Sequence, residues 1–297
     1  METCRRQLKE TGQQSEDILH ERDGQSLQIL EGMVMNMEEE LYLECTDSLE
    51  GVFTGIYDAY LRRRPHSTLH LCLGEEENPR LFAVYEKCQV DEGKAAKVAR
   101  TIGNRLGTET YLAICRALAS READKAEAVY KTVVTGLKMR DGRQVMGNLA
   151  DPYVHRVFEL ARFTANEVHF HIEFIRFREL ENGILYAPIG PKNNVLTFVV
   201  PHFADRLPLE NFVIHDQVRN LFAMHPAGKD WYLISGGEEK LEFDHAFSEG
   251  EKRYSELFTS FFHSIAIKER RNATLQRNML PIRYRKYMTE FEKRGIK

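Results

Sequence analysis

The sequence has few cysteines, and none of them are closely paired. Five occur among 297 residues, and no two have the spacing of a CxxC motif. Disulfide frameworks and structural zinc sites depend on such clusters, so neither is expected here. Each cysteine is better explained as a small buried hydrophobic side chain, which fits a reducing cytoplasm.

Long apolar runs are also missing. The chain has no apolar stretch of about eighteen residues, the length that a membrane-spanning helix needs. The first residues, METCRRQLKETGQQSED, lack the apolar core of a secretion signal. We therefore expect a cytoplasmic location and no membrane contact.

Several motifs of common enzyme classes are absent. The chain has no GxGxxG after a predicted strand, no GxxxxGKS/T, no GxSxG and no HExxH. Such motifs build phosphate-binding turns, nucleophile turns and zinc sites. Dinucleotide oxidoreductases, P-loop ATPases and α/β-hydrolases are thereby disfavoured, and we expect neither a cofactor nor a bound metal.

Charge, in contrast, is plentiful and segregated. The whole chain has a formal net charge of −4, yet residues 268–297 carry ten Lys or Arg against three Glu. The first fifty residues have the opposite balance, with thirteen acids and four Lys or Arg. Positive charge interleaved with Tyr284 and Tyr287 suits a phosphate backbone or an acidic partner, although a solvated basic helix end has the same composition.

The pattern of apolar residues predicts an α+β fold. Short strand-like runs at 41–45, 66–73 and 80–88 accompany a helix over 49–63, and helical stripes continue from residue 91 to about residue 170. We expect N-terminal short strands plus a helical bundle, then a C-terminal antiparallel sheet packed with helices. The expected divisions are a mobile acidic tail (1–38), an N-terminal α+β and helical lobe (39–165) and a C-terminal α+β lobe with a basic helical end (166–297).

In the C-terminal half, strands and helices alternate. Residues 168–174 alternate apolar and polar side chains as a half-buried strand does. The pattern slips after Phe174, which a β-bulge, or a helix ending near Phe170, would explain. Asn182-Gly183 predicts a hairpin turn before a strand at 184–188. A helix should follow from Pro191 to Arg206, then strands over 211–224 and 231–235. The last long helix, 251–267, should bury one face made of Tyr254, Leu257, Phe258, Phe261, Phe262 and Ile265.

Residues 167–173 contain a first group of candidate site residues. On a strand, His169, His171 and Glu173 would share one face, because alternate side chains point the same way. Imidazole and carboxylate groups can bind a metal or exchange protons, but a polar sheet face is the favoured interpretation.

A second group lies farther along the chain. His202 and Arg206 are four residues apart on one predicted helix, and His215, Asp216 and Arg219 follow on the next element. A histidine–carboxylate pair can tune a general base. The same residues can instead form a buried network that locks the helix to the sheet.

A third group is basic. Arginine binds phosphate with two N–H groups, and Asn or Gln can bridge to sugar or base. The candidate phosphate contacts in this region are Arg270, Asn272, Gln276, Arg283 and Tyr284, with Arg271, Arg277 and Arg285 as further cations.

The order of these motifs adds a family resemblance. The motifs are Glu167-x-His169, Ile175-Arg176-Phe177, Leu185-Tyr186-Ala187-Pro188-Ile189 before Pro191, His202-Phe203-x-x-Arg206, Val213-Ile214-His215-Asp216-x-x-Arg219, and Ile267-x-x-Arg270-x-Asn272 with Gln276, Pro281, Arg283-Tyr284 and Glu290. With them, residues 40–292 resemble an uncharacterised bacterial family described as DNA metabolism proteins, whose core is a domain of unknown function. Leu280 and Arg285 depart from the Met and Trp usual there, which weakens stacking and adds positive charge.

The resemblance implies a cellular setting. Members are associated with a radical-SAM protein thought to act in DNA modification or repair, and some are fused to a uracil-DNA-glycosylase-like domain. Arg176, Arg206 and Arg219, which lie in these motifs, join the candidate phosphate contacts.

Three functions remain open. The leading hypothesis is a protein of DNA metabolism that binds nucleic acid or a nucleic-acid-processing partner, with its polar motifs converging on the basic end. The second is an enzyme acting on a nucleobase or nucleotide, whose acid–base groups would be Glu167, His169, His202, His215 and Asp216. The third is a non-catalytic accessory subunit of the radical-SAM protein.

Overall fold

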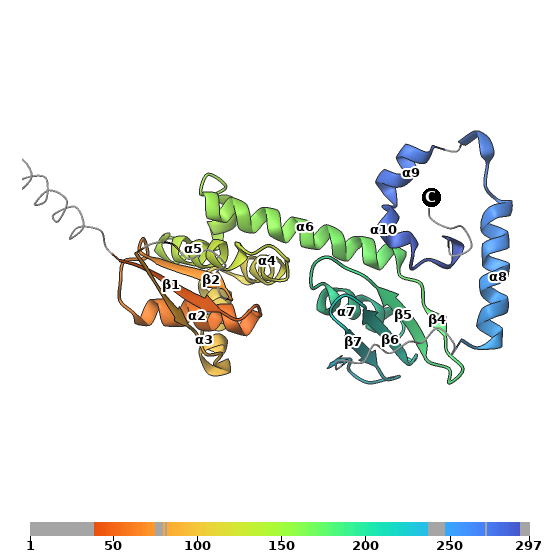
Figure 1. Cartoon of the computed structure of the whole chain (residues 1–297), viewed down its shortest axis with the longest axis horizontal. Coiled ribbons are helices and arrows are strands. Elements are labelled where there is room, and N and C mark those ends of the chain that lie inside the picture. The colour runs from red at the N-terminus through yellow and green to blue at the C-terminus, as the bar shows by residue number, and fades with distance from the viewer. Residues whose placement is uncertain (1–38, 75–79, 81, 237–246, 271, 292–297) are drawn as a thin grey trace, which may run out of the picture.

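The structure, a computed structural model, describes residues 39–74, 80, 82–236, 247–270 and 272–291 (Figure 1). The acidic tail expected over 1–38 and the candidate cation Arg271 lie outside these ranges. Among the helices described, none has both the length and the apolar composition needed to cross a membrane.

A small parallel sheet comes first. Its strands are β1 (Glu40–Cys45), β2 (Leu69–Leu73) and β3 (Ala83–Lys87), in the order β2-β1-β3, and both outer strands run parallel to β1. Helix α2 (Leu49–Leu61) connects β1 to β2, and the Ser48 hydroxyl caps its first turn. The predicted short strands and the helix between them are confirmed.

A group of helices follows, as the apolar stripes predict. These are α3 (Glu92–Arg105), α4 (Thr108–Leu118), α5 (Lys125–Lys138), the 3-10 helix η1 (Gly142–Gly147) and α6 (Pro152–Phe174). Their buried apolar side chains join those of the small sheet in one core that reaches from Leu41 to Leu160.

Helix α6 includes the residues predicted as a strand. It continues through 168–174, so that strand prediction is wrong, and His169, His171 and Glu173 do not share a strand face. The alternation misleads because this half of α6 buries polar residues: Glu167 and His171, one turn apart, are only 3% and 2% exposed. In Figure 1, α6 runs from the N-terminal helices to the C-terminal sheet.

The second sheet has five strands in the order β4-β5-β6-β7-β8. They are β4 (Arg178–Glu179), β5 (Leu185–Ile189), β6 (Phe212–Asp216), β7 (Leu221–His225) and β8 (Tyr232–Ser235). The predicted hairpin joins β4 to β5, and β6-β7 and β7-β8 are also antiparallel, but β5 and β6 run parallel. The sheet is mixed rather than antiparallel throughout. The helix between β5 and β6 returns the chain to the end of the sheet at which β5 begins, so β6 runs in the same direction as β5.

That helix, α7 (Leu196–Arg206), covers one face of the sheet. Its Val199 and Phe203 join Ile214 of β6 in a buried core. The opposite face carries a smaller core made of Leu180, Tyr186, Val213, Phe222 and Phe247. Helix α7 begins later than the predicted Pro191, because the preceding residues form a loop that is bound to other elements.

The last elements of the described chain are three helices and two 3-10 turns. These are α8 (Glu249–Ser264), η2 (Lys268–Arg270), α9 (Ala273–Met279), α10 (Ile282–Arg285) and η3 (Thr289–Phe291). In Figure 1, α8 stands beside the five-stranded sheet, and α9 and α10 return to the end of α6.

The apolar face of α8 is exposed, which corrects the prediction that it is buried. Tyr254 is 76% and Phe261 58% exposed, and no residue of α8 is buried in the described structure. Of this face, only Phe262 has ring contacts within the described residues, with the neighbouring His263 and with Phe291 of η3 at a centroid distance of 5.8 Å. Amphipathic spacing predicted the helix correctly, but it says nothing about which element would cover the apolar face.

We expect Phe261→Ala to change the free energy of unfolding by less than about 0.5 kcal/mol, because truncating an exposed side chain leaves no cavity. Phe212→Ala, in the core beneath α7, should cost about 3–5 kcal/mol. Urea unfolding can be followed by the fluorescence of Trp231, the single tryptophan, which packs against that core. A loss for Phe261→Ala as large as that for Phe212→Ala would show that the α8 face is covered.

Candidate functional site

The carboxylate of Glu167 joins three segments of the chain. Its two oxygens accept the backbone amides of Lys192 and Asn193, each at 2.9 Å. One oxygen also lies 3.2 Å from Nη2 of Arg283, which belongs to α10. A buried carboxylate is tolerated when it is paired and hydrogen-bonded in this way. Glu167 therefore holds the loop of residues 190–194, called the 190–194 loop below, and the C-terminal helices against α6.

The same loop is held from its carbonyl side by Arg219. Its Nη2 donates to the carbonyl of Lys192 at 2.6 Å, and Nη1 donates to the carbonyl of Pro191 at 3.4 Å. Asp216, fully buried at the end of β6, orients this arginine through a 3.1 Å contact between Oδ2 and Nη1. Asp216 Oδ1 accepts the backbone amides that follow it, those of Val218 and Arg219. Two amides of the loop thus lie on one carboxylate, and two of its carbonyls lie on one guanidinium.

The 190–194 loop also contacts the N-terminal helices and the C-terminal segment. The Asn193 side chain accepts the amide of Arg121 at 3.1 Å, and the amide of Asn194 donates to the carbonyl at the end of α4. At Gly190, a Cβ atom would overlap the hydroxyl of Tyr287. A larger residue at position 190 would therefore require Tyr287 to move.

A third arginine–carboxylate pair lies nearby. Arg176 Nη2 is 3.0 Å from Glu290, whose side chain is 4% exposed, and Arg176 Nη1 donates to the carbonyls of Glu173 and Ile175 at the end of α6. Three of the candidate phosphate contacts therefore have their charge matched inside the protein. The pairs are Arg283 with Glu167, Arg219 with Asp216, and Arg176 with Glu290.

His171 lies on the same side of α6 as Glu167. Its ring meets that of Tyr284 edge-to-face with centroids 5.0 Å apart, and its Nε2 atom has no hydrogen-bond partner among the residues that the structure describes. Burial, and to a smaller extent the neighbouring positive charge of Arg283, lowers the pKa of His171 to about 4. The imidazole is therefore neutral at physiological pH. Tyr284, only 3% exposed, is part of this packing and does not present its ring to solvent.

His202 and Arg206 lie at a separate pocket. This cavity of about 330 Å³ is formed where α6 and α7 both end, and its other lining residues are Ile172, Ile175, Phe177, Phe203 and Leu207. Both polar side chains are exposed, and within the described residues neither has a hydrogen bond or an ion pair. The pocket therefore combines an apolar floor with two side chains able to bind an anion.

His215 lies on the opposite face of the sheet from α7. Its Nδ1 is 2.7 Å from the Tyr186 hydroxyl, and its ring stacks on Phe222 at a centroid distance of 4.0 Å. Its Nε2 contacts the Asn220 side chain at 3.3 Å, and burial lowers its pKa. Strand alternation separates it from His202, because successive side chains of β6 point to opposite faces.

The remaining candidates lie on the surface. His169 contacts Glu173 at 2.9 Å on the exposed side of α6. Asn272 caps α9 by accepting the amide of Leu275, so its side chain has a structural partner. Gln276 and Arg270 are exposed.

The structure thus brings some predicted residues together and separates others. Glu167 meets Arg283 and Tyr284 in one network, and Asp216 with Arg219 completes it across the loop. His169, His202 and His215 occupy three other places. Sequence reasoning left three participants out of its candidate site: the amides of Lys192 and Asn193 and the carboxylate of Glu290. It considered His171 only as one of three polar groups on a strand face.

One signal for His171 was available in the sequence. Thr164, Glu167 and His171 recur at three and four residues, the spacing of one helix face, and all three are buried. Among the described residues, no group of three or more His, Cys, Asp or Glu side chains is arranged to hold a metal ion.

Residues 123–290 match the model of a family described as a domain of unknown function, DUF4130. The chain belongs to this family. The matched range contains the whole Glu167 network and the His202–Arg206 pocket, and it leaves out the small parallel sheet. Membership of the DUF4130 family confirms that the core is a domain of unknown function, as the resemblance implied.

Other comparisons add little to the DUF4130 match. No match was found among curated proteins. A solved structure named as a member of the s1p family of ribosomal proteins, DHH domain, shares 9% identity over 63% of this chain and 73% of its own, with a TM-score of 0.29. A likeness that weak carries no conclusion about fold or function.

We expect Glu167→Ala to lower the free energy of unfolding by about 3–5 kcal/mol, because it leaves a guanidinium and two amides without their partner. Glu173→Ala, on the exposed side of the same helix, should cost no more than about 1 kcal/mol. Both can be measured by urea unfolding with Trp231 fluorescence. Equal effects of the two substitutions would contradict a structural role for Glu167.

Acidification should destabilise the C-terminal half through His171. Its folded pKa of about 4 lies below the ordinary 6.5, so between these values the unfolded chain binds the extra proton and stability falls as pH falls. The full loss is about 3 kcal/mol. We expect His171→Gln to reduce the loss of stability between pH 6.5 and 4.5, and His169→Gln, an exposed control, to leave it unchanged. An unchanged pH dependence in His171→Gln would contradict burial of a neutral imidazole.

Proposed function

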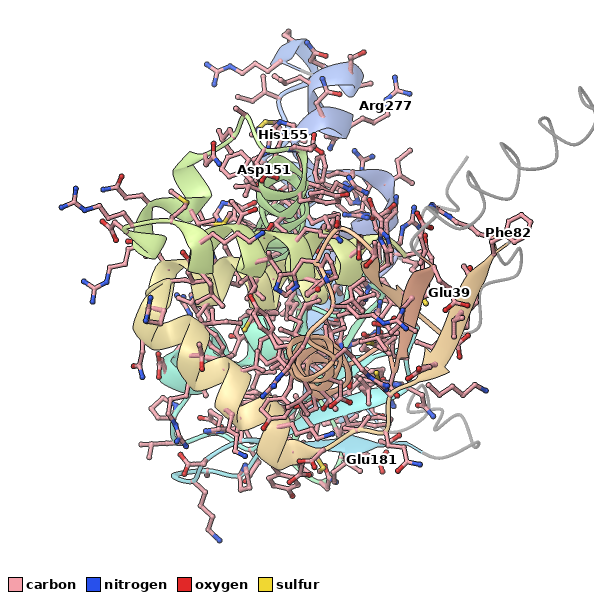
Figure 2. The ribbon with its side chains drawn as sticks, turned by 90° about the vertical axis from the view of Figure 1, so that its left-hand side faces the viewer. Glu39, Phe82, Asp151, His155, Glu181 and Arg277 are labelled. Carbon is pink, nitrogen blue, oxygen red and sulfur yellow. The ribbon has the colours of Figure 1, made fainter. Side chains whose placement is uncertain are left out.

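We propose that this protein binds nucleic acid, in a role in DNA metabolism, through the basic surface of its C-terminal segment. The observation that supports this most strongly is the position of two arginines, Arg270 and Arg277. Both are exposed, and neither has a carboxylate partner within the described residues. Arg277 projects from α9 at the outer end of the molecule (Figure 2). An unpaired guanidinium at the surface remains available for a phosphate group.

Neighbouring side chains extend this surface. Arg285 is held by the carbonyls of Gln276 and Leu280, with its guanidinium over the ring of Phe291. Lys286 lies over the ring of Tyr287. Neither cation has a carboxylate partner within the described chain, so both add positive potential. Binding that neutralises phosphates releases counterions, which makes affinity fall with salt.

The enzyme hypothesis receives less support. Its five acid–base candidates occupy separate places: Glu167 and Asp216 are bound to arginines, His169 is on the surface, His215 is beneath the sheet and His202 is at the pocket. Acid–base catalysis needs such groups to reach one substrate atom together. We therefore propose a binding function rather than this reaction.

A radical-SAM protein is the second candidate partner, and the exposed apolar face of α8 favours it. Monomeric proteins rarely leave such a contiguous apolar face open, and surfaces of this kind mark protein–protein contacts. The family resemblance suggests a radical-SAM protein as the partner that would bind this face of α8. Mixing the two proteins on a sizing column should give a complex that Phe261→Ser weakens. Co-elution unaffected by Phe261→Ser would place the contact elsewhere, and separate elution would remove this candidate.

We expect Arg270→Ala/Arg277→Ala to weaken binding of a single-stranded or duplex oligonucleotide about 10–100-fold at low salt. The slope of log affinity against log salt should fall by about one per phosphate contact removed. Fluorescence anisotropy at several salt concentrations measures both quantities. Arg100→Ala, which removes an exposed arginine from α3, serves as the matched control. Binding that is absent, independent of salt or equally weakened by the control would contradict the proposal.

A further inference from the structure

The pocket between the ends of α6 and α7 has a firm aromatic floor. Phe177 meets Phe203 edge-to-face with centroids 5.1 Å apart, and meets Phe212 in the same way at 5.5 Å. Ile172 and Ile175, from the end of α6, line another side. Five of the seven side chains that line the pocket are apolar, so it can take a ring beside its two polar side chains. The volume, about 330 Å³, is at the small end of ligand sites, so it suits one ring system with one substituent group.

The rim of the pocket carries one cation, Arg206, and one imidazole, His202. His202 and Arg206 lie one turn apart on α7, so both side chains reach the same opening. The ring of His202 is fixed by an edge-to-face contact with Phe203 at 5.1 Å. Arg206 has no carboxylate partner in the described structure, unlike the three arginines of the Glu167 network.

The helix ends at the pocket mean that an anion can bind there only with the help of the Arg206 guanidinium. Helix α6 ends at Phe174 and α7 at Arg206, so two helix C-termini meet at this pocket. Arg176 already donates to the last carbonyls of α6, which leaves the partial negative charge of the α7 end. An anion is repelled there unless a cation covers it. The Arg206 guanidinium, with two parallel N–H donors, supplies that cation in the geometry that phosphate accepts.

We propose that this pocket binds a heteroaromatic ring that carries a phosphate, and, given the proposed nucleic-acid function on which this inference rests, that the ligand is a nucleoside 5′-monophosphate group. The ring lies against Phe203 and Ile172, and the phosphate is held by Arg206 with His202 beside it. The group can come from a free mononucleotide or from the phosphorylated end of a strand. Both sources present the same chemistry to the pocket.

The test is calorimetric titration of the full chain with the four deoxynucleoside 5′-monophosphates, the matching nucleosides and inorganic phosphate. We expect at least one monophosphate to bind more than about tenfold tighter than its nucleoside or phosphate alone, because one charge-assisted contact is worth that much. Arg206→Met should lower monophosphate affinity about 10–100-fold and leave nucleoside affinity within about twofold.

Two further variants keep the result interpretable. Arg100→Met removes an equal charge from α3 and should change nothing, while Ile172→Phe should fill the pocket and weaken nucleosides and monophosphates alike. Trp231 fluorescence confirms that each variant is folded. Absence of monophosphate binding, indifference to Arg206→Met, or an equal loss in Arg100→Met would overturn the inference.

Measuring the binding of oligonucleotides as well as mononucleotides distinguishes a failure of this inference from a failure of the proposed function. If mononucleotides do not bind but Arg270→Ala/Arg277→Ala still weakens oligonucleotide binding, the pocket inference is wrong and the proposed function stands. If the unmodified protein binds neither mononucleotides nor oligonucleotides, the pocket inference and the proposed function are both wrong. Comparing oligonucleotides with and without a 5′-phosphate identifies the source. A larger effect of Arg206→Met on the phosphorylated strand indicates a strand end, and equal effects indicate a free mononucleotide.

Discussion

The buried carboxylate of Glu167 is the contact on which the arrangement of the C-terminal half depends. Its partners come from two segments distant in the sequence, the 190–194 loop and α10, and it lies on the helix that connects both to the N-terminal core. A buried charge has few acceptable positions, because each oxygen must keep its donors. Apolar contacts alone would let the segments shift relative to one another, whereas the hydrogen-bond donors on Glu167 fix one position for each segment.

Pairing also divides the arginines into two classes. Arg176, Arg219 and Arg283 each face a carboxylate that is almost fully buried, so their charge is used within the fold. Arg206 and Arg277 face no carboxylate within the part of the chain that the structure describes. The net charge of the C-terminal stretch therefore overstates what a phosphate backbone would meet. The surface available for binding is smaller, and it lies where cations lack internal partners.

Local periodicity predicted much of the fold. The short N-terminal strands, the helical stripes and the Asn182-Gly183 hairpin depend on spacing within a few residues, and they are confirmed. Three features depended on distant partners and were mispredicted. Residues 168–174 look like a strand only if buried residues are assumed to be apolar. The sequence of α8 does not indicate which element, if any, covers its apolar face. The direction of β6 relative to β5 is set by α7, which lies between them in the chain.

The candidate site was harder to predict for the same reason. Glu167 and Arg283 were both singled out, but nothing in a single sequence joins residues so far apart. The backbone amides of Lys192 and Asn193 have no sequence signature at all. His171 shares a helix face with Glu167, and that could be seen only once the segment was taken as a helix.

The end of α6 connects the pocket to the basic segment. Arg176 donates to the carbonyls of Glu173 and Ile175 and pairs with Glu290, which lies in η3. Ile175 and its neighbour one turn back, Ile172, line the pocket. The wall of the pocket and the C-terminal segment are thus anchored to the same turn of helix by one guanidinium. A nucleotide in the pocket and a strand on the basic segment would therefore be held in a fixed relation, because hydrogen-bonded charge pairs have discrete geometries rather than a continuous range.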